Sequence, residues 1–178
     1  MSIRTLHLLG SPVLRERSSE VPEVDDHVRE LVADLFDTMR AEQGIGLAAN
    51  QIGTAERVAI VDIGEEEAIV LINPVIVERE GTIRDEEGCL SIPDIYGDVD
   101  RAARVVVQTT TLEGNRVAVE ATALRARTVQ HEIDHLDGIL FVDHLSPLKR
   151  RMLLKKWKKM RKGQTGYLKQ VAPAPVED

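Results

Sequence analysis

The sequence predicts a single α+β domain in which mostly antiparallel β-sheets pack around one central helix, with an additional helix towards each end of the chain. Three observations indicate this class. β-Branched runs separated by turn residues fill the middle of the chain, apolar residues recur at helical spacing at 24–41 and 124–138, and a basic helical segment follows at 146–162. Strands that precede a late helix favour helices packed on an antiparallel sheet. The length of 178 residues suits one domain.

The N-terminal part of the chain predicts two helices. Ser11 and Pro12 begin a short helix that runs to Arg17. The stretch 24–41 is predicted to be an amphipathic helix, because its apolar residues recur at helical spacing, namely Val28, Leu31, Val32, Leu35 and Met39. The Gly-rich stretch GIGLAANQIG, at 44–53, is predicted to be a loop that leads into a strand.

The middle of the chain reads as a series of strands. RVAIVDI (57–63) and AIVLINP (68–74) are predicted to form a hairpin with EEE at its tip. PVIVERE and TIRDEEG are predicted to be two short strands joined at Gly81, with Pro93 ending the segment that follows. The stretch 104–121 is predicted to be a strand, a turn at 113–115 and another strand.

The C-terminal part predicts two more helices and a tail. Apolar residues at 124, 129, 133 and 136 mark a helix that Gly138 ends. Ser146 caps the last helix, with Pro147 at its first position. We expect residues 1–163 to form the domain, including the basic helix 146–162, and the Pro-rich residues 164–178 to be a flexible tail.

Composition narrows the function classes. No run of eighteen apolar residues is present, so no membrane span is expected, and the N-terminal apolar patch is too short for a signal peptide. The single cysteine, Cys89, excludes an intrachain disulfide and fits a reducing compartment. A cytoplasmic location is therefore expected.

Charge is unevenly distributed along the chain. The net charge is −7, yet ten basic residues and no acidic residue lie between Lys149 and Lys169. An acidic body with a basic end favours a polyanionic partner for that end. The alternatives are a docked helix whose charges are solvated, RNA of the ribosome, and a membrane surface; DNA is not expected.

The stretch VQHEIDHLDG, at 129–138, raises the possibility of a metal site. His131 and His135 are four residues apart, so on a helix they share one face, with Glu132 beside them. Two imidazoles at this spacing can reach one divalent ion, and the glutamate can act on a water molecule without being a ligand. The alternative is a partly exposed helix with incidental histidines.

A third ligand is needed, and the residues alone leave it open. The metzincin pattern requires a histidine where Phe141 stands, and a thermolysin-like site requires a downstream glutamate where the chain offers only Glu177. His144 remains, although it falls past the helix end. Cys89 also remains, because a thiolate binds divalent transition metals strongly, although a lone cysteine is commonly a small buried apolar residue.

Three motifs together resemble those of the peptide deformylase family. They are GIGLAANQ at 44–51, EGCLS at 87–91 and QHEIDHLDG at 130–138, and they stand in the family's order and approximate spacing. The stretches LGSPVLRERS and LSPLKR also resemble the family, so the likeness covers roughly residues 3 to 150.

The resemblance implies a metal site and a reaction. Cys89, His131 and His135 would hold one divalent ion with water in the fourth position, usually iron(II), with zinc, nickel or cobalt able to replace it. The water would attack the formyl carbon of an N-formylmethionyl peptide, and Glu132 would act as general base and then general acid. Gln51 and the backbone N–H of Leu90 would stabilise the oxyanion.

The resemblance also implies a substrate pocket and its support. Gly46 would pair with the peptide backbone, and Ile45, Leu124 and the stem of Arg127 would wall the methionine pocket. Glu87 would orient the cysteine loop by pairing with Arg101. The alternatives are that the apolar members belong to the core, that Gln51 is a buried amide bonded to backbone, and that Glu87 is an exposed acid.

Three positions depart from the family's pattern. Ala123 stands where relatives often have glycine, Arg125 where they have an apolar residue, and Tyr96 where some have an arginine. These changes leave the pocket rim and the preference beyond methionine open. Two rival functions also remain: an HExxH endopeptidase, and a catalytically silent module that binds the ribosome or RNA.

Overall fold

The computed structural model describes residues 2–174 and confirms the predicted α+β class. Its elements, in chain order, are β1 (Leu6–His7), η1 (Pro12–Arg15), α1 (Asp26–Ala41), β2 (Gly46–Ala48), η2 (Ala49–Ile52), β3 (Val58–Val61), β4 (Ile69–Ile72), β5 (Val75–Glu80), β6 (Ile83–Cys89), β7 (Ile92–Arg101), β8 (Arg104–Thr110), β9 (Arg116–Thr122), α2 (Ala123–Leu136), η3 (Phe141–His144), α3 (Pro147–Met160) and β10 (Leu168–Lys169).

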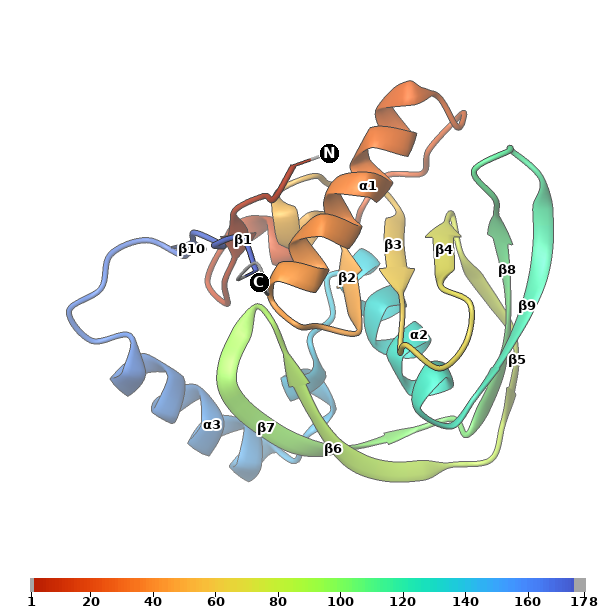
Figure 1. Ribbon diagram of the computed structural model, residues 1–178. Helices are drawn as coiled ribbons and strands as arrows, with labels where there is room; N and C mark the ends of the chain where they lie inside the picture. The colour runs from red at the N-terminus through yellow and green to blue at the C-terminus, as the bar shows by residue number, and fades with distance from the viewer. Residues whose placement is uncertain (1, 175–178) are drawn as a thin grey trace.

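The strands form small antiparallel sheets that surround α2 (Figure 1). One sheet has the order β2-β3-β4 and another β5-β8-β9, while β6 pairs with β7 and β1 pairs with β10. Because β2 lies at the edge of its sheet, one side of its backbone is not covered by a neighbouring strand. In residues 2–174, no helix combines the length and apolar character that crossing a bilayer requires.

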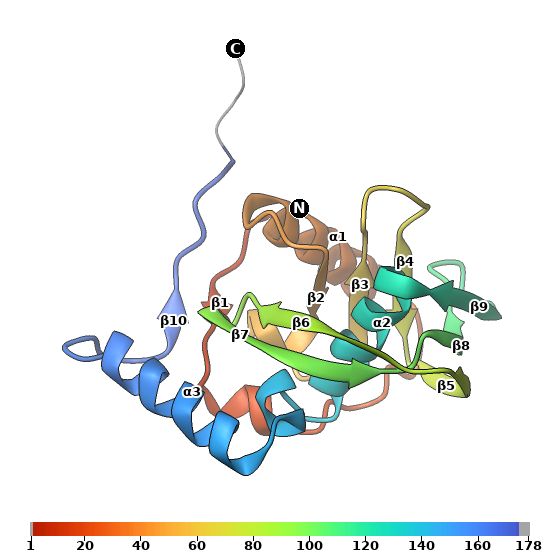
Figure 2. The same ribbon diagram turned by 90° about the horizontal axis from the view of Figure 1, so that it is seen from below.

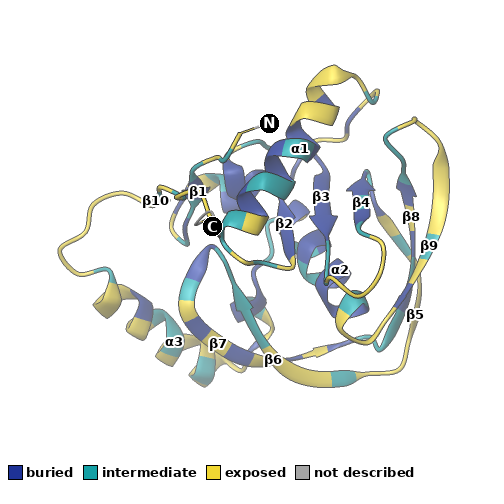
Figure 3. Ribbon diagram, viewed as in Figure 1, coloured by how far each residue is buried: buried dark blue, intermediate teal, exposed yellow. Residues whose placement is uncertain are grey.

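Helix α2 is buried on most of its surface, which fixes the position of its polar residues. Its apolar residues Ala126, Val129, Ile133 and Leu136 pack in one cluster with β3, β4, β8 and β9. Arg127, Gln130, Glu132 and His135 are buried as well. Figure 3 shows most of α2 in the interior with β2 and β3, whereas much of α3 and β9 is exposed. A helix surrounded in this way holds its side chains in fixed positions.

Helix α1 packs through the predicted apolar residues, all five of which are buried. The helix begins at Asp26 rather than at Val24, because the Asp25 side chain accepts a hydrogen bond from the Val28 N–H and caps the N-terminus. With β2, β3 and η2, it encloses a second part of the core. The predicted amphipathic helix is therefore confirmed, with a shifted start.

The two strands predicted on either side of Gly81 are present as β5 and β6. They pair with different partners, β5 with β8 and β6 with β7. The long strand β7 was missed, because Pro93 was taken as an end. Its buried positions alternate as in any strand, but they include Gly97 and Arg101, which obscures the apolar pattern.

The stretch at 44–53 was predicted to be a loop and is more ordered than that. It forms strand β2 and one turn of 3₁₀-helix, and Leu47 to Ile52 are all buried. Gly53 ends this turn with a φ of 87°, a conformation that glycine adopts without strain.

Helix α3 begins as predicted and docks through one aromatic residue. The Ser146 hydroxyl accepts a hydrogen bond from the Lys149 N–H, and Pro147 occupies the first position. Trp157 is the buried residue of α3, and its Nε1–H donates to the Leu9 carbonyl at 3.2 Å. Most of the other residues of the helix are exposed, and Figure 2 shows α3 at the margin of the body.

The segment after α3 returns to the body. Leu168 and Lys169 form β10 against β1, so this part of the predicted tail 164–178 is held in a strand pair. Residues 175–178 lie outside the described residues, and the expectation of a flexible end stays a prediction there.

Candidate metal centre

Three predicted donors, from two elements distant in sequence, lie close together. Cys89 ends β6, while His131 and His135 lie one turn apart on the same face of α2. The Cys89 Sγ is 3.4 Å from the His135 Nε2, and the two Nε2 atoms are 3.2 Å apart. One donor atom from each residue lies within 4.8 Å of the other two.

This arrangement fits a transition-metal ion. Donors that share a tetrahedral ion at bond lengths of about 2.0–2.3 Å lie roughly 3.3–3.6 Å apart, close to the separations seen. Burial lowers the pKa of His135 well below its ordinary value, which keeps the ring neutral, as metal binding requires. Burial also lowers the pKa of His131, but hydrogen bonds to Cys89 and Glu87 outweigh burial and raise it. The donor cluster therefore attracts positive charge.

Glu87 holds the imidazole of His131 from behind. Its Oε1 accepts from the His131 Nδ1–H at 2.9 Å, so Nε2 is the ring nitrogen that faces the other donors. Arg101 donates to both carboxylate oxygens at 2.9 Å, and Arg127 donates to Oε2 at 2.9 Å. Burial raises the pKa of Glu87, but these hydrogen bonds and the charges of Arg101 and His131 outweigh it and lower the pKa to about 2.

Asp134 and His144 extend this network away from the donors. Arg101 donates to the Asp134 Oδ2 at 2.5 Å, and the His144 Nε2 lies 2.7 Å from the same oxygen. His144, the alternative third ligand in the sequence, is therefore engaged by a carboxylate. Among the described residues, the donor cluster consists of Cys89, His131 and His135, and His144 is not part of it.

Glu132 lies beside the donors in a confined space. Its side chain is buried, and its Oε2 has no hydrogen-bond partner among the described residues. A Cβ atom at Gly46 would lie 2.5 Å from the Glu132 Oε1, so glycine allows β2 to approach the carboxylate. Burial raises the pKa of Glu132 to about 7, near which a general base works well at neutral pH.

Gln51 directs its amide nitrogen at the donors. Its Oε1 accepts from the Ala48 N–H at 2.9 Å, so the other end of the amide carries the donor. The Nε2 is 3.7 Å from the Cys89 Sγ and donates to the Ser91 Oγ at 3.1 Å. The position of Gln51 beside the cluster is therefore compatible with both interpretations, a buried amide bonded to backbone and a donor to the oxyanion.

A pocket of about 470 Å³ opens onto these groups. Ile45, Leu90 and Leu124 line it, and Ile45 and Leu124 are exposed, 40% and 50% respectively, rather than part of the core. Arg127 also lines it, but both of its Nη atoms are engaged: they donate to Glu87 and to the carbonyls of Ile83, Asp85 and Val99. Its free surface is thus its aliphatic stem.

Two residues that the sequence analysis did not predict, Asn50 and Arg57, hold the end of α2 in place. Asn50 is fully buried, and its Nδ2–H donates to the His135 carbonyl at 2.6 Å. The Arg57 Nη1–H donates to the Leu136 carbonyl at 3.0 Å. Asn50 stands next to Gln51 in the motif that marks the site, which could have drawn attention to it, whereas no pattern points to Arg57.

The three departures have different structural consequences. Ala123 has a φ of 51°, a conformation that glycine adopts more readily. Arg125 turns away from the pocket and donates to Glu66 and to the Glu67 carbonyl at the tip of the β3–β4 hairpin. Tyr96 lines the pocket and packs over Gly88, where a Cβ would lie 2.7 Å from its ring. Ala123 therefore affects the backbone at the start of α2, and Tyr96 affects the pocket rim. Arg125 does not line the pocket.

Comparisons with known proteins identify the family to which the chain is similar. The model of the polypeptide deformylase family matches residues 3–151. The peptide deformylase of Alkalilimnicola ehrlichii is 47% identical over 176 residues, covering 93% of this chain and 99% of its own. That of Brucella suis is 46% identical and covers 90% and 94%.

Solved structures give the same result. The crystal structure of a peptide deformylase from Legionella pneumophila has a TM-score of 0.86 and 42% identity, covering 92% of this chain and 98% of its own. That of the Ehrlichia chaffeensis peptide deformylase in complex with actinonin has a TM-score of 0.85 and 37% identity, with coverage of 91% and 99%. The fold, the three motifs and these relatives lead to one conclusion: the chain belongs to the polypeptide deformylase family.

Proposed function

We propose that Cys89, His131 and His135 bind one divalent metal ion, which this deformylase-family hydrolase uses to remove the formyl group from N-formylmethionyl peptides. The enzyme class and deformylation of nascent polypeptides follow from the family. The observation that carries the metal site is the convergence of one thiolate and two imidazoles beside the buried carboxylate of Glu132, whose Oε2 has no hydrogen-bond partner in residues 2–174. Three protein donors leave a coordination position open, as in catalytic sites.

The bound ion supplies Lewis-acid chemistry: it lowers the pKa of water and polarises a carbonyl group. Iron(II) is our proposal for the physiological ion, with zinc, nickel or cobalt able to replace it, since all accept mixed thiolate and imidazole ligands. A thiolate paired with iron(II) would be sensitive to oxidation, and a reducing cytoplasm is the location we propose.

Glu132 is proposed to carry the proton. Its Oε1 faces Gly46 at the pocket and its Oε2 is available, so it can accept the proton of the attacking water and return it to the departing amine. The Gln51 Nε2–H and the Leu90 N–H are proposed to donate to the developing oxyanion. Gln51 is well oriented for this, because its other end is fixed by the Ala48 N–H.

The pocket is proposed to bind the formylmethionine side chain and the peptide that follows it. Gly46 lies on an edge strand, so an extended peptide can pair with it. Exposed Ile45 and Leu124, with the aliphatic stem of Arg127, form apolar walls suited to a methionine side chain. Glu87 and Arg101 are proposed to support the site by fixing His131 and the cysteine end of β6.

The test is formate release from formyl-Met-Ala-Ser with iron(II) under anaerobic conditions. We expect the wild type to release formate without internal cleavage. Glu132→Ala should abolish formate release and retain the metal, whereas His135→Ala should lose the metal. His27→Ala is the matched control, because His27 is an exposed histidine that pairs with Glu56 away from the site. Internal cleavage would support an endopeptidase, and no reaction with any metal would support a silent binding module.

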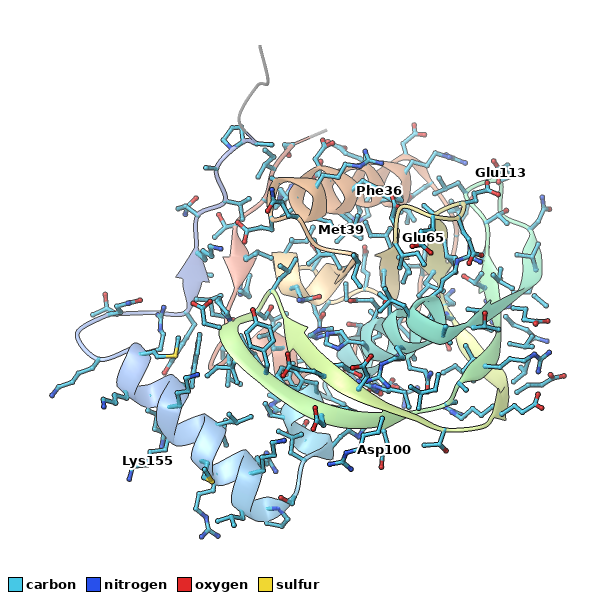
Figure 4. All side chains as sticks on the ribbon, turned by 60° about the horizontal axis from the view of Figure 1, so that its bottom comes forward. Phe36, Met39, Glu65, Asp100, Glu113 and Lys155 are labelled. Carbon is cyan, nitrogen blue, oxygen red and sulfur yellow. The ribbon has the colours of Figure 1, made fainter. Side chains whose placement is uncertain are left out.

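A second proposal concerns α3, which we propose contacts ribosomal RNA. Arg151, Lys155, Lys158 and Lys159 have no acidic partner among the described residues, whereas Arg150 pairs with Asp143. Figure 4 shows Lys155 on the outer side of α3, away from the body. Unpaired cations on one exposed helix suit phosphate contacts.

Ribosome co-sedimentation tests this second proposal. Binding should weaken as salt rises, and Lys155→Glu with Lys158→Glu should weaken it further while formate release from a free peptide stays unchanged. Arg17→Glu with Arg79→Glu, a reversal of two exposed cations of the same size and sign outside α3, is the control. Co-sedimentation that is insensitive to both salt and the charge reversals would contradict RNA contact by α3.

A further inference from the structure

The segment that follows α3 comes back to the mouth of the pocket. It lies beyond the residues that the family model matches, which end at 151. In β10, Lys169 pairs with Leu6 and Leu168 with His7, and the Leu8 N–H donates to the Tyr167 carbonyl at 2.7 Å. Figure 2 shows β10 beside β1, close to the end of the β6–β7 hairpin.

This segment is docked by side chains as well as by backbone. Tyr167 packs directly on Gly10, where a Cβ atom would lie 2.3 Å from its ring. Arg161 lies over the same ring, 5.9 Å from its centroid, and also donates to the Gly166 carbonyl. Val171 packs against the core cluster that contains α1. The position of Lys169 is therefore fixed from both sides.

Lys169 meets Glu42 at the pocket. Its Nζ is 2.5 Å from the Glu42 Oε2, and both residues line the pocket. Glu42 is the C-cap of α1 and begins the loop that leads to Ile45 and Gly46. Its side chain is only 14% exposed, so Lys169 neutralises a carboxylate that water reaches poorly.

The loop after α1 needs such support for two reasons. The C-terminus of a helix carries partial negative charge, so an acidic C-cap is unfavourable unless a cation is near. Gln43, the next residue, has a φ of 55°, a conformation that costs free energy for a side chain other than glycine. Residues held in such conformations persist when their surroundings fix them.

We infer that Lys169 is a positioning residue for substrate binding: through Glu42 it fixes the loop at 42–46 against which the peptide lies. The inference rests on the proposed peptide-binding role of this pocket. Within the described residues, Lys169 makes no hydrogen bond or ion pair with the metal donors, Glu132 or Gln51, so its loss should weaken binding and leave the chemical step intact.

The expected effect is confined to KM. For Lys169→Met, KM for formyl-Met-Ala-Ser should rise about two- to fivefold, the range that a partly exposed ion pair supports, with kcat unchanged. KM for formylmethionine amide, which lacks the downstream peptide, should change less, because it contacts less of the loop. Lys169→Arg should restore most of the affinity, since a cation remains at the Glu42 carboxylate.

A double-mutant cycle separates action through Glu42 from direct contact with the substrate. If Lys169 acts through Glu42, adding Lys169→Met to Glu42→Gln should give no further rise in KM. If the second substitution raises KM as much as in the wild type, or if Lys169→Met leaves KM unchanged for both substrates, the inference is overturned. Lys162→Met, at an exposed lysine of the same segment that has no ion pair among the described residues, is the control.

Failure of the inference differs from failure of the proposed function. A wild type that releases no formate overturns the proposed function. An active wild type with a Lys169→Met variant of unchanged KM overturns the inference alone. Thermal unfolding of each variant, compared with Lys162→Met, shows whether a KM change accompanies a loss of folding, which would contradict a local effect.

Discussion

Glu87 accepts a hydrogen bond from the Nδ1–H of His131 at 2.9 Å, and this contact decides which ring nitrogen faces the other donors. The carboxylate is itself fixed by Arg101 and Arg127, so the orientation of one histidine depends on residues from β6, β7 and α2. Partners of this kind commonly determine metal affinity almost as strongly as the ligands do.

Glu87→Gln should therefore weaken metal binding. The amide retains an oxygen that can accept from His131, but it loses the charge that two buried arginines require. We expect metal affinity to fall about 10- to 100-fold. Competition with a chelator measures this, and Glu86→Gln, an exposed neighbour on the same strand, is the control. Equal affinity in the two variants would contradict the supporting role of Glu87.

Ala123→Gly should stabilise the fold. Ala123 is exposed with a φ of 51°, and a left-handed conformation costs roughly 1–2 kcal/mol for alanine. The greater freedom of glycine in the unfolded chain offsets about 0.5–1 kcal/mol of this gain. Denaturant unfolding should show a net increase of about 1 kcal/mol or less. Ala126→Gly, in the interior of the same helix, should instead destabilise by about 1 kcal/mol; a loss at both positions would refute the strain at Ala123.

Asn50→Ala should destabilise the end of α2 that carries His135. Asn50 is fully buried and donates to the His135 carbonyl at 2.6 Å. Removing a buried donor costs about 1–3 kcal/mol. Denaturant unfolding checks the stability, with Asn115→Ala in the exposed β8–β9 turn as the control. A cost no larger than that of the control would mean that Asn50 does not hold the helix.

The free energy of unfolding should depend on pH in the acid range because of Asp143. Burial raises its pKa, but hydrogen bonds from Arg15 and from the Leu140 N–H outweigh burial and lower it. A carboxyl whose pKa is lower in the folded state stabilises the fold above its unfolded pKa of about 4 and loses this effect as pH falls. The difference in unfolding free energy between wild type and Asp143→Asn should thus be largest near neutral pH and shrink below pH of about 4.

The control for this pH effect is Asp26→Asn, because the Asp26 side chain is fully exposed beside Arg29. Unfolding of all three proteins is measured across the acid range. A difference between wild type and Asp143→Asn that grows as pH falls would have the opposite sign and would reject the role of the Arg15 contact.

Patterns of residues close in sequence were sufficient to predict the helices and the types of metal donor. The apolar spacing of α1, the cap of α3 and the pair of histidines one turn apart are each set by residues close in sequence. Strand β7 escaped prediction because its inward positions include Gly97 and Arg101, and the latter is buried only because Glu87 and Asp134 neutralise it. The pairing of β5 with β8 likewise depends on a partner far along the chain.

By itself, the sequence determined a chain of the α+β class that carries one cysteine, an HExxH helix and three family motifs. The tertiary structure alone decided how close Cys89 comes to His135, which carboxylate orients His131, and that Lys169 meets Glu42 at the pocket. The physical reason is that periodicity and capping report on neighbours within one or two turns. Each of these contacts instead joins residues more than forty positions apart, and the packing of the whole core brings them together.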